Sequence, residues 1–167
     1  STSIRTIRNT LVDSQGNETN SIIANIGTKV TFGNEGNPCI TKMNDGSYLC
    51  IVCIEEDEEI DINVYRSIDD GASFDLVSKN ALTERIDVSS SKYSIDRVSC
   101  SSIHGQILLV FSARSANSSH TNKNHLLQYA SVDGGGTFKK VTTDTIVDSF
   151  AFHSIQVFKT HNQLCIS

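Results

Sequence analysis

Two octapeptides of the same pattern lie 64 residues apart in this chain, beginning at Ser67 and at Ser131. Ser67–Phe74 reads SIDDGASF and Ser131–Phe138 reads SVDGGGTF, so the two agree at Ser, Asp, Gly, Ser/Thr and Phe. Each one follows a short apolar segment that has a tyrosine two residues before the octapeptide. A repeat of this length indicates similar structural units that stack on one another to bury their apolar faces.

The repeat extends upstream of each octapeptide. Pro38 to Leu49 and Arg97 to Leu108 span the same number of positions, and each passes through a glycine turn into an apolar segment. A third copy begins at His153 and runs to the last residue of the sequence. The chain therefore holds about two and a half units of one repeat.

The candidate strands are short, rich in β-branched or aromatic residues, and bounded by Gly, Asn, Asp or Ser. No segment with a helical period and caps competes with them, so we predict an all-β protein. With about four short strands in each period, the unit is typical of a propeller blade, and rings of this kind need ~4 to 8 blades. The predicted strands are Lys29–Phe32, Ser47–Ile54, Ile62–Arg66, Gln106–Ser112, His125–Ala130 and Ser154–Phe158.

Composition limits the classes of partner. A net charge of −5 without a basic stripe argues against nucleic acid. The longest apolar run, Leu49–Ile54, is far shorter than the ~20 residues that a membrane span needs. We therefore expect no nucleic acid and no membrane span, and we expect the missing blades to come from a longer chain or from another copy.

The residues shared by the octapeptides suit a tight turn between two strands of one blade. An aspartate carboxylate bonds backbone N–H groups about two residues on, as Asp69 and Asp133 are expected to do. Glycine permits the positive φ that Gly71 and Gly135 would need. Phe74 and Phe138 would cover the turn against the blade. These residues, with Ser67 and Ser131, are predicted to be structural and not catalytic.

The octapeptide pattern resembles the Asp box, or BNR repeat, of the sialidase superfamily. The resemblance implies a sialidase-type β-propeller, six-bladed when complete, with residues 36–167 forming blades 1, 2 and part of 3. Residues 1–35 are then a lead-in segment that could supply a strand closing the ring. Sialidases hold the substrate carboxylate with three arginines, and the first would fall in Gly36-Asn37-Pro38, where arginine is missing.

The same resemblance suggests two acidic site residues. Asp57, flanked by Glu56 and Asp61, matches the catalytic acid/base aspartate, although an exposed and self-repelling acidic loop is an alternative. Asp96, followed by Arg97, matches an aspartate that lines the substrate pocket, and a turn residue at the start of a strand is the alternative.

Part of the chain is also similar to the fungal exo-arabinanases, which are related propeller hydrolases without a carboxylate clamp. Ile107–Phe111 and Leu126–Phe138 are similar to their second blade. Hydrolysis in that group uses paired carboxylates. The segment Asp148–Ser167 contains no glutamate, which argues against their catalytic acid at that place.

No cofactor or metal is expected. Cys50 and Cys53 resemble half of a zinc site, but their odd separation places them on opposite faces of a strand, so we interpret them as buried thiols. Gly134–Gly136 leads into a strand and not a helix, so it is no phosphate-binding loop.

The sequence thus predicts a glycan-directed, exo-glycosidase-like protein that lacks the first substrate-clamping arginine and acts on a glycan or glycoprotein. It leaves open whether turnover survives. The alternative is a non-catalytic binding or adhesion scaffold that uses the loops Glu55–Asp61 and Ser115–Asn124. Two glycosylation sequons, at Asn17 and Asn117, favour a secreted or extracellular location.

Overall fold

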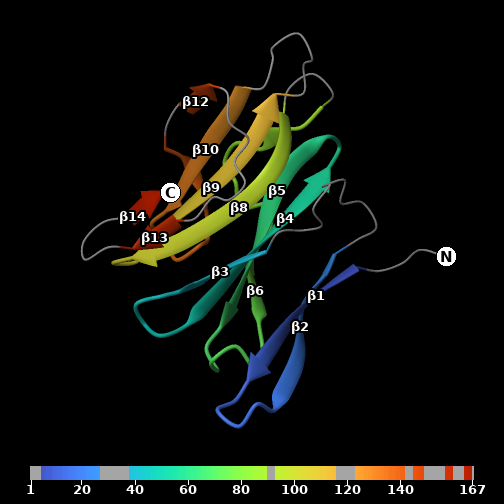
Figure 1. Ribbon diagram of the computed structural model, residues 1–167, viewed down its shortest axis with the longest axis vertical. Coiled ribbons are helices and arrows are strands. Elements are labelled where there is room, and N and C mark those ends of the chain that lie inside the picture. Colours follow the sequence, from blue (N-terminus) through green and yellow to red (C-terminus); the bar gives the residue numbers. More distant parts are fainter. Residues whose placement is uncertain are drawn as a thin grey trace, which may run out of the picture.

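The computed structural model describes residues 5–26, 38–89, 93–115, 123–141, 145–148, 157–159 and 164–166. Across these ranges the regular secondary structure is β-strand, arranged in antiparallel sheets (Figure 1). The all-β prediction is confirmed. The predicted strand Lys29–Phe32 lies outside the described residues.

The first blade is an antiparallel sheet in which four strands follow one another in both sequence and space. The segment from Leu49 to Cys53 is continuously buried, because both faces of this central strand are covered. A short additional strand pairs with the beginning of the third strand. The strands are β3 (Cys39–Lys42), β4 (Tyr48–Glu56), β5 (Glu59–Ser67), β6 (Asp75–Ser78) and the additional β7 (Ile86–Asp87).

The second blade repeats this order, with its outermost position shared by two short strands that both pair with β10. Its first strand was not predicted, because its serine-rich sequence has no clear apolar alternation. The strands are β8 (Tyr93–Ile103), β9 (Gln106–Ser115), β10 (Lys123–Ser131), β11 (Lys139–Lys140) and β12 (Thr145–Asp148).

Two hairpins flank the two blades. The N-terminal one is long and was not predicted as a pair of strands. The C-terminal one opens the third repeat, as its sequence indicated, and residues 154–156 of its predicted first strand lie outside the described residues. They consist of β1 (Arg5–Val12) with β2 (Glu18–Ile26), and of β13 (Val157–Lys159) with β14 (Leu164–Ile166).

The first strands of the three units, β3, β8 and β13, lie next to one another in that order (Figure 1). Thr41 Oγ1 on β3 donates a hydrogen bond to Ser102 Oγ on β8, 3.3 Å away. Ser99 Oγ on β8 accepts a hydrogen bond from the backbone N–H of Val157 on β13, at 2.9 Å. Successive first strands that pack in this way around a common axis are the arrangement of a β-propeller.

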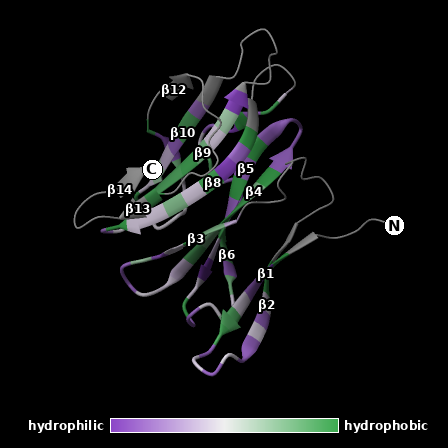
Figure 2. Ribbon diagram, in the orientation of Figure 1, coloured by the Kyte–Doolittle hydropathy of each residue, from purple (hydrophilic) through white to green (hydrophobic). Residues whose placement is uncertain are grey.

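The main hydrophobic core lies between the first two blades. The rings of Phe111 and Tyr129 meet edge to face there, with centroids 5.7 Å apart. Figure 2 shows hydrophobic residues along the strands and hydrophilic residues at the tip of the β4–β5 hairpin. The core includes Leu49, Ile51, Ile60, Ile62, Val64, Ile107, Leu109, Phe111, Leu127, Tyr129 and Phe138.

The octapeptide Ser67–Phe74 forms the turn between β5 and β6. Ser67 Oγ accepts a hydrogen bond from the N–H of Gly71 at 2.8 Å and donates one to Asp69 Oδ1 at 2.8 Å. Asp69 in turn accepts bonds from the N–H of Ser73 at 2.9 Å and from its hydroxyl at 2.6 Å. The carboxylate therefore reaches four residues along the chain, and not two as we expected.

The octapeptide Ser131–Phe138 has the same geometry. The N–H of Gly135 donates to Ser131 Oγ at 3.0 Å, and Asp133 accepts from the N–H and hydroxyl of Thr137 at 3.0 and 2.7 Å. Gly71 and Gly135 have φ values of 90° and 95°, which disfavour any residue with a Cβ. Identity at four positions and a Ser/Thr exchange at a fifth thus correspond to one hydrogen-bonded turn used twice.

The hairpin β1–β2 packs against the octapeptide turn of the first blade. The first blade packs against the octapeptide turn of the second blade in the same way. A Cβ at Gly135 would lie 3.1 Å from Val64 of the first blade, and a Cβ at Gly71 would lie 3.2 Å from Asn9 of β1. Asn9 Nδ2 also donates a hydrogen bond to the Gly71 carbonyl at 2.8 Å. The hairpin therefore occupies the position of a preceding blade. That residues 1–35 close the ring stays a prediction.

Candidate functional site

The candidate acidic residues lie at the end of the blades opposite the octapeptide turns. The β4–β5 hairpin, the beginning of β8 and the end of β9 share this end of the molecule (Figure 1). β5 and β10 run from here to the two octapeptides, because each blade is an antiparallel meander. Asp57, Asp61 and Asp96 therefore belong to one end of the propeller.

Asp57 lies at the tip of the β4–β5 hairpin. Glu56 pairs with Glu59, so Asp57 and Glu58 form a two-residue loop, and both have positive φ, at 53° and 64°. The Asp57 side chain is exposed. Asp57 is therefore not buried among its acidic neighbours. Its catalytic role stays a prediction.

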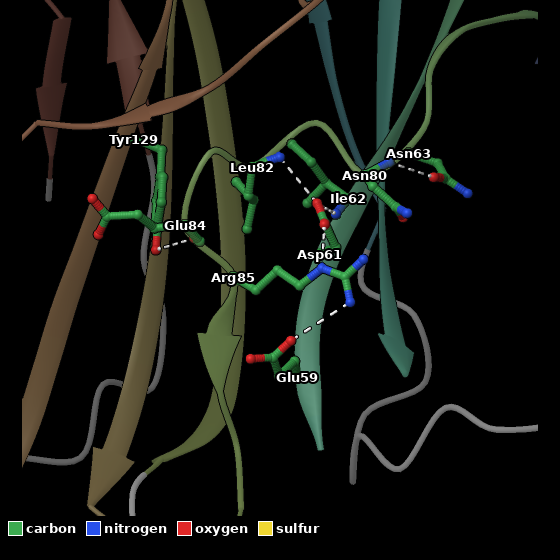
Figure 3. Close-up of polar contacts among 9 residues, drawn as sticks. All are labelled: Glu59, Asp61, Ile62, Asn63, Asn80, Leu82, Glu84, Arg85 and Tyr129. Carbon is green, nitrogen blue, oxygen red and sulfur yellow. Dashed lines mark hydrogen bonds and ion pairs between the residues drawn. The ribbon is translucent and has the colours of Figure 1, made fainter. Parts of the chain in front are cut away.

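Asp61 is the buried carboxylate of the same hairpin, with an exposed fraction of 3%. Its Oδ1 accepts hydrogen bonds from the N–H of Ile62 at 2.8 Å and of Leu82 at 2.9 Å (Figure 3). Its Oδ2 accepts a hydrogen bond from Arg85 Nε at 3.0 Å. These bonds fasten the segment after β6 to β5.

The guanidinium of Arg85 extends this network toward solvent. Arg85 Nη1 lies 3.5 Å from Glu59 Oε2, at the exposed beginning of β5 (Figure 3). With two backbone donors and one cation, Asp61 has its charge compensated within the protein. The arrangement is that of a structural carboxylate, and it does not present Asp61 to a substrate.

Asp96 is held differently. It lies at a β-bulge in β8, where the register with β9 shifts between Ile95 and Arg97. Arg114 near the end of β9 donates a hydrogen bond from Nη2 to Asp96 Oδ1 at 2.6 Å. The side chain of Asp96 is 19% exposed and that of Arg114 is 56% exposed. The pair is therefore anchored at the carboxylate and open to solvent at the guanidinium.

The Asp96–Arg114 pair favours charged groups at this position. The hydrogen bond to Asp96, together with its negative charge, raises the pKa of Arg114 above its usual value. Arg97, next to Asp96 in sequence, has an exposed side chain. An ionised carboxylate beside exposed guanidinium groups can accept hydrogen bonds from sugar hydroxyls while the arginines donate to ring or glycosidic oxygens.

Sequence reasoning missed Arg114. It follows an apolar run and precedes a polar loop, so nothing local distinguishes it. Counting back along both strands from the His104–Gly105 turn places Arg114 opposite Ile95, one position from Asp96, and this count is the signal that could have brought the two residues together.

Other residues that the sequence singled out lie outside these contacts. Gly36, Asn37 and most of the loop 115–124 are outside the described residues. Cys50 and Cys53 are buried in different core clusters, as their odd spacing predicted. Among the described residues, no three His, Cys, Asp or Glu side chains are grouped to hold a metal ion.

Two further features concern the described part of the chain. It contains no helix long and apolar enough to cross a membrane. A cavity of about 170 Å³ lies between β1 and the first octapeptide turn, and none of the candidate acidic residues lines it. Its lining consists of Asn9, Leu11, Ile40, Tyr48, Asp70, Gly71 and Phe74.

Comparison with solved structures identifies the fold. The chain superposes on the α-L-arabinofuranosidase of Fusarium graminearum with a TM-score of 0.50 and 18% identity, covering 87% of this chain and 42% of that one. It superposes on the α-L-arabinanase of Penicillium chrysogenum with a TM-score of 0.50 and 12% identity, again covering 87% of this chain and 42% of that one. No protein-family model and no curated protein matches the sequence.

The chain is therefore part of a β-propeller, as predicted, and it spans less than half the length of these two neighbours. Neither neighbour is described as a sialidase. The octapeptides suggested a sialidase because sialidases contain the same turn. That turn is a structural feature of the blade, so it does not identify the chemistry of the site. The blade number of the complete ring stays a prediction.

Proposed function

We propose that the complete protein is a glycan-directed, exo-glycosidase-like propeller whose site includes Asp96. The Asp96–Arg114 ion pair carries this proposal, because it places a solvent-accessible charged pair at a bulge on the first strand of a blade. Bulges re-aim side chains and are over-represented next to active sites. The fold likeness to an arabinofuranosidase and an arabinanase supports the same interpretation.

In this proposal, Asp96 acts while it accepts the hydrogen bond from Arg114. Arg114 stabilises the carboxylate, so Asp96 serves as a base, a nucleophile or an acceptor for a sugar hydroxyl, and the proton donor is a second carboxyl group. Asp57 is the candidate for that donor within this chain. Arg97 and Arg114 bind the sugar. The remaining site residues come from further blades, supplied by a longer chain or by another copy.

A neutral terminal sugar fits the proposal better than a sialic acid. The first arginine of a carboxylate clamp would fall at Gly36, which has no side chain to replace it. The two structural neighbours are named for arabinose-containing substrates. An α-L-arabinofuranoside is therefore the first substrate to test, and a sialoside is the comparison.

The test uses the full-length protein with aryl glycosides of arabinofuranose, xylose and sialic acid. We expect release of arabinose and a fall in kcat of at least ~100-fold for Asp96→Asn, as for loss of a group that acts in the transition state. Asp45→Asn is the matched control, because Asp45 forms a comparable surface pair with Arg66 at the other end of the blade. Equal activity of both variants would reject a role for Asp96.

A non-catalytic binding scaffold is the second candidate. The exposed position of Asp57 at a hairpin tip favours a binding scaffold. A hairpin tip presents its charged side chains to a partner, and these side chains keep their hydration in the free protein. In that case Asp96→Asn binds glycan on an array as the wild type does, and neither protein releases sugar.

A further inference from the structure

Two cysteines on neighbouring blades lie on matching positions of adjacent strands. Cys39 begins β3 and Cys100 lies within β8, and these strands run side by side in the same direction (Figure 1). Two residues further along each strand, Thr41 Oγ1 contacts Ser102 Oγ at 3.3 Å. Side chains two residues apart in a strand point to the same side, so Cys39 and Cys100 face each other as Thr41 and Ser102 do.

The surroundings of the two thiols agree with this placement. Cys100 is buried in the core between the first two blades, and Cys39 is partly buried against the same core. A hydrogen bond with the Cys100 thiol, followed by burial, raises the pKa of Cys39 well above its usual value. Both thiols therefore belong to the same packed contact between the two blades.

We propose that Cys39 and Cys100 form a disulfide that joins the first two blades when the protein folds in an oxidising compartment. The bond would close a loop that contains almost the whole first blade. It would hold β3 against β8, the strand on which Asp96 lies. The inference concerns the assembly of the blades and is independent of the proposed catalytic activity.

The other described cysteines are less suited to this bond. Cys50 packs in a separate cluster with Ile23 and Val52, on the face toward the N-terminal hairpin. Cys53 shares the core with Cys39 and Cys100 but belongs to β4, where it pairs with Ile62 of β5 within the first blade. The part of the chain that the structure describes holds no group of three His, Cys, Asp or Glu side chains placed to bind a metal ion.

The bond forms by thiol–disulfide exchange. The thiolate of one cysteine attacks the sulfur of glutathione disulfide and releases one glutathione, and the second cysteine then attacks the mixed disulfide and releases another. Two protein thiols are oxidised and one glutathione disulfide is reduced to two thiols. The raised pKa of Cys39 makes this exchange slow in the folded protein, so the bond forms while the blades assemble.

Peptide mapping of the full-length protein tests the proposal directly. The protein is refolded with a glutathione redox pair, denatured, alkylated without reduction and digested with trypsin. Cleavage after lysine and arginine gives peptides 30–42 and 98–114, which contain Cys39 and Cys100 alone, whereas peptide 43–66 contains both Cys50 and Cys53. We expect a cross-linked pair of the first two peptides. Alkylated Cys39 and Cys100, or a link from either one to peptide 43–66, would overturn the proposal.

Thermal melting gives a second readout. Reduction is expected to lower the Tm of the oxidised protein by roughly 5–10 °C, the range for a structural disulfide in a domain of this size. Cys39→Ser abolishes this difference, and Cys50→Ala, as the matched control, retains it. If Cys39→Ser does not fold, the peptide map of the wild-type protein still decides the matter.

Discussion

Asp61 Oδ1 accepts a hydrogen bond from the backbone N–H of Leu82, 2.9 Å away, and so ties the segment after β6 to the beginning of β5 in the first blade. The same carboxylate accepts a hydrogen bond from Arg85. Asp61→Asn keeps the volume but places an amide against the guanidinium. We expect it to reduce the free energy of unfolding by about 1–3 kcal/mol, because a buried hydrogen-bonded charge pair is broken.

Urea denaturation measures this effect. Asp57→Asn is the control, since Asp57 lies two residues before Glu59 on the exposed hairpin tip and asparagine tolerates its positive φ. We expect the control to stay within about 0.5 kcal/mol of the wild type. Similar values for the two variants would show that Asp61 is not the anchor of this segment.

The aspartates of the octapeptide turns predict an acid-dependent loss of stability. Hydrogen bonds from the residues around them lower the pKa of Asp69 and of Asp133 from 3.8 to about 2. For both, the leading cause is a hydrogen bond from the residue four positions on. The folded pKa is below the unfolded value, so the stabilisation is complete above pH 3.8 and disappears as the pH falls through about 2.

Melting temperatures between pH 5 and pH 2 test this expectation. Asp133→Asn should melt at a lower temperature at pH 5, and its Tm should change less than that of the wild type as the pH is lowered. Asp70→Asn, in the first turn but outside the hydrogen-bond pattern shared by the two turns, is the control and should keep the wild-type slope. If the Tm of all three proteins decreased equally with pH, the carboxylate of Asp133 would not be a source of the acid-dependent loss of stability.

Gly135 is required for two reasons, its positive φ and its close contact with the first blade, and mutation can separate the two. Its φ is 95°, and an added Cβ would lie 3.1 Å from Val64 and 3.3 Å from Leu49 in the first blade. Gly135→Ala is therefore expected to destabilise by about 2–4 kcal/mol, from strain and from overpacking. Gly134→Ala, at φ 74° with open space around it, should cost only about 1–2 kcal/mol. Equal losses would show that the contact between the blades tolerates a methyl group.

How much of the fold the sequence could predict depends on whether the information was local. The octapeptides revealed the blades, because each turn is stabilised by residues within eight positions. β8 was missed, because its serines bond across to other strands, as Ser102 does to β3 and Ser99 does to β13. Those partners lie about 60 residues away along the chain. No local alternation reveals such a strand.

The same difference between local and long-range information applies to the candidate site. Asp96 was identified through the register of the repeat, but its partner Arg114 depends on the β8–β9 pairing and on the bulge at Asp96. Asp61 was considered only as a neighbour of Asp57. Its burial became evident only when the segment around Arg85 was known to fold back on β5. Contacts between distant segments therefore account for what the sequence could not provide.

The two octapeptide phenylalanines are equivalent in sequence but differ in their surroundings. Phe138 is fully buried between the first two blades, where its backbone N–H and carbonyl bond to Ala81 and Thr83. Phe74 is only partly buried, against the cluster that contains Ile23. Phe138→Ala should therefore cost about 3–5 kcal/mol, as for a large core side chain, and Phe74→Ala distinctly less. Urea denaturation of both variants makes the comparison, and a larger loss for Phe74→Ala would mean that the N-terminal hairpin, and not the second blade, forms the tighter contact with the first.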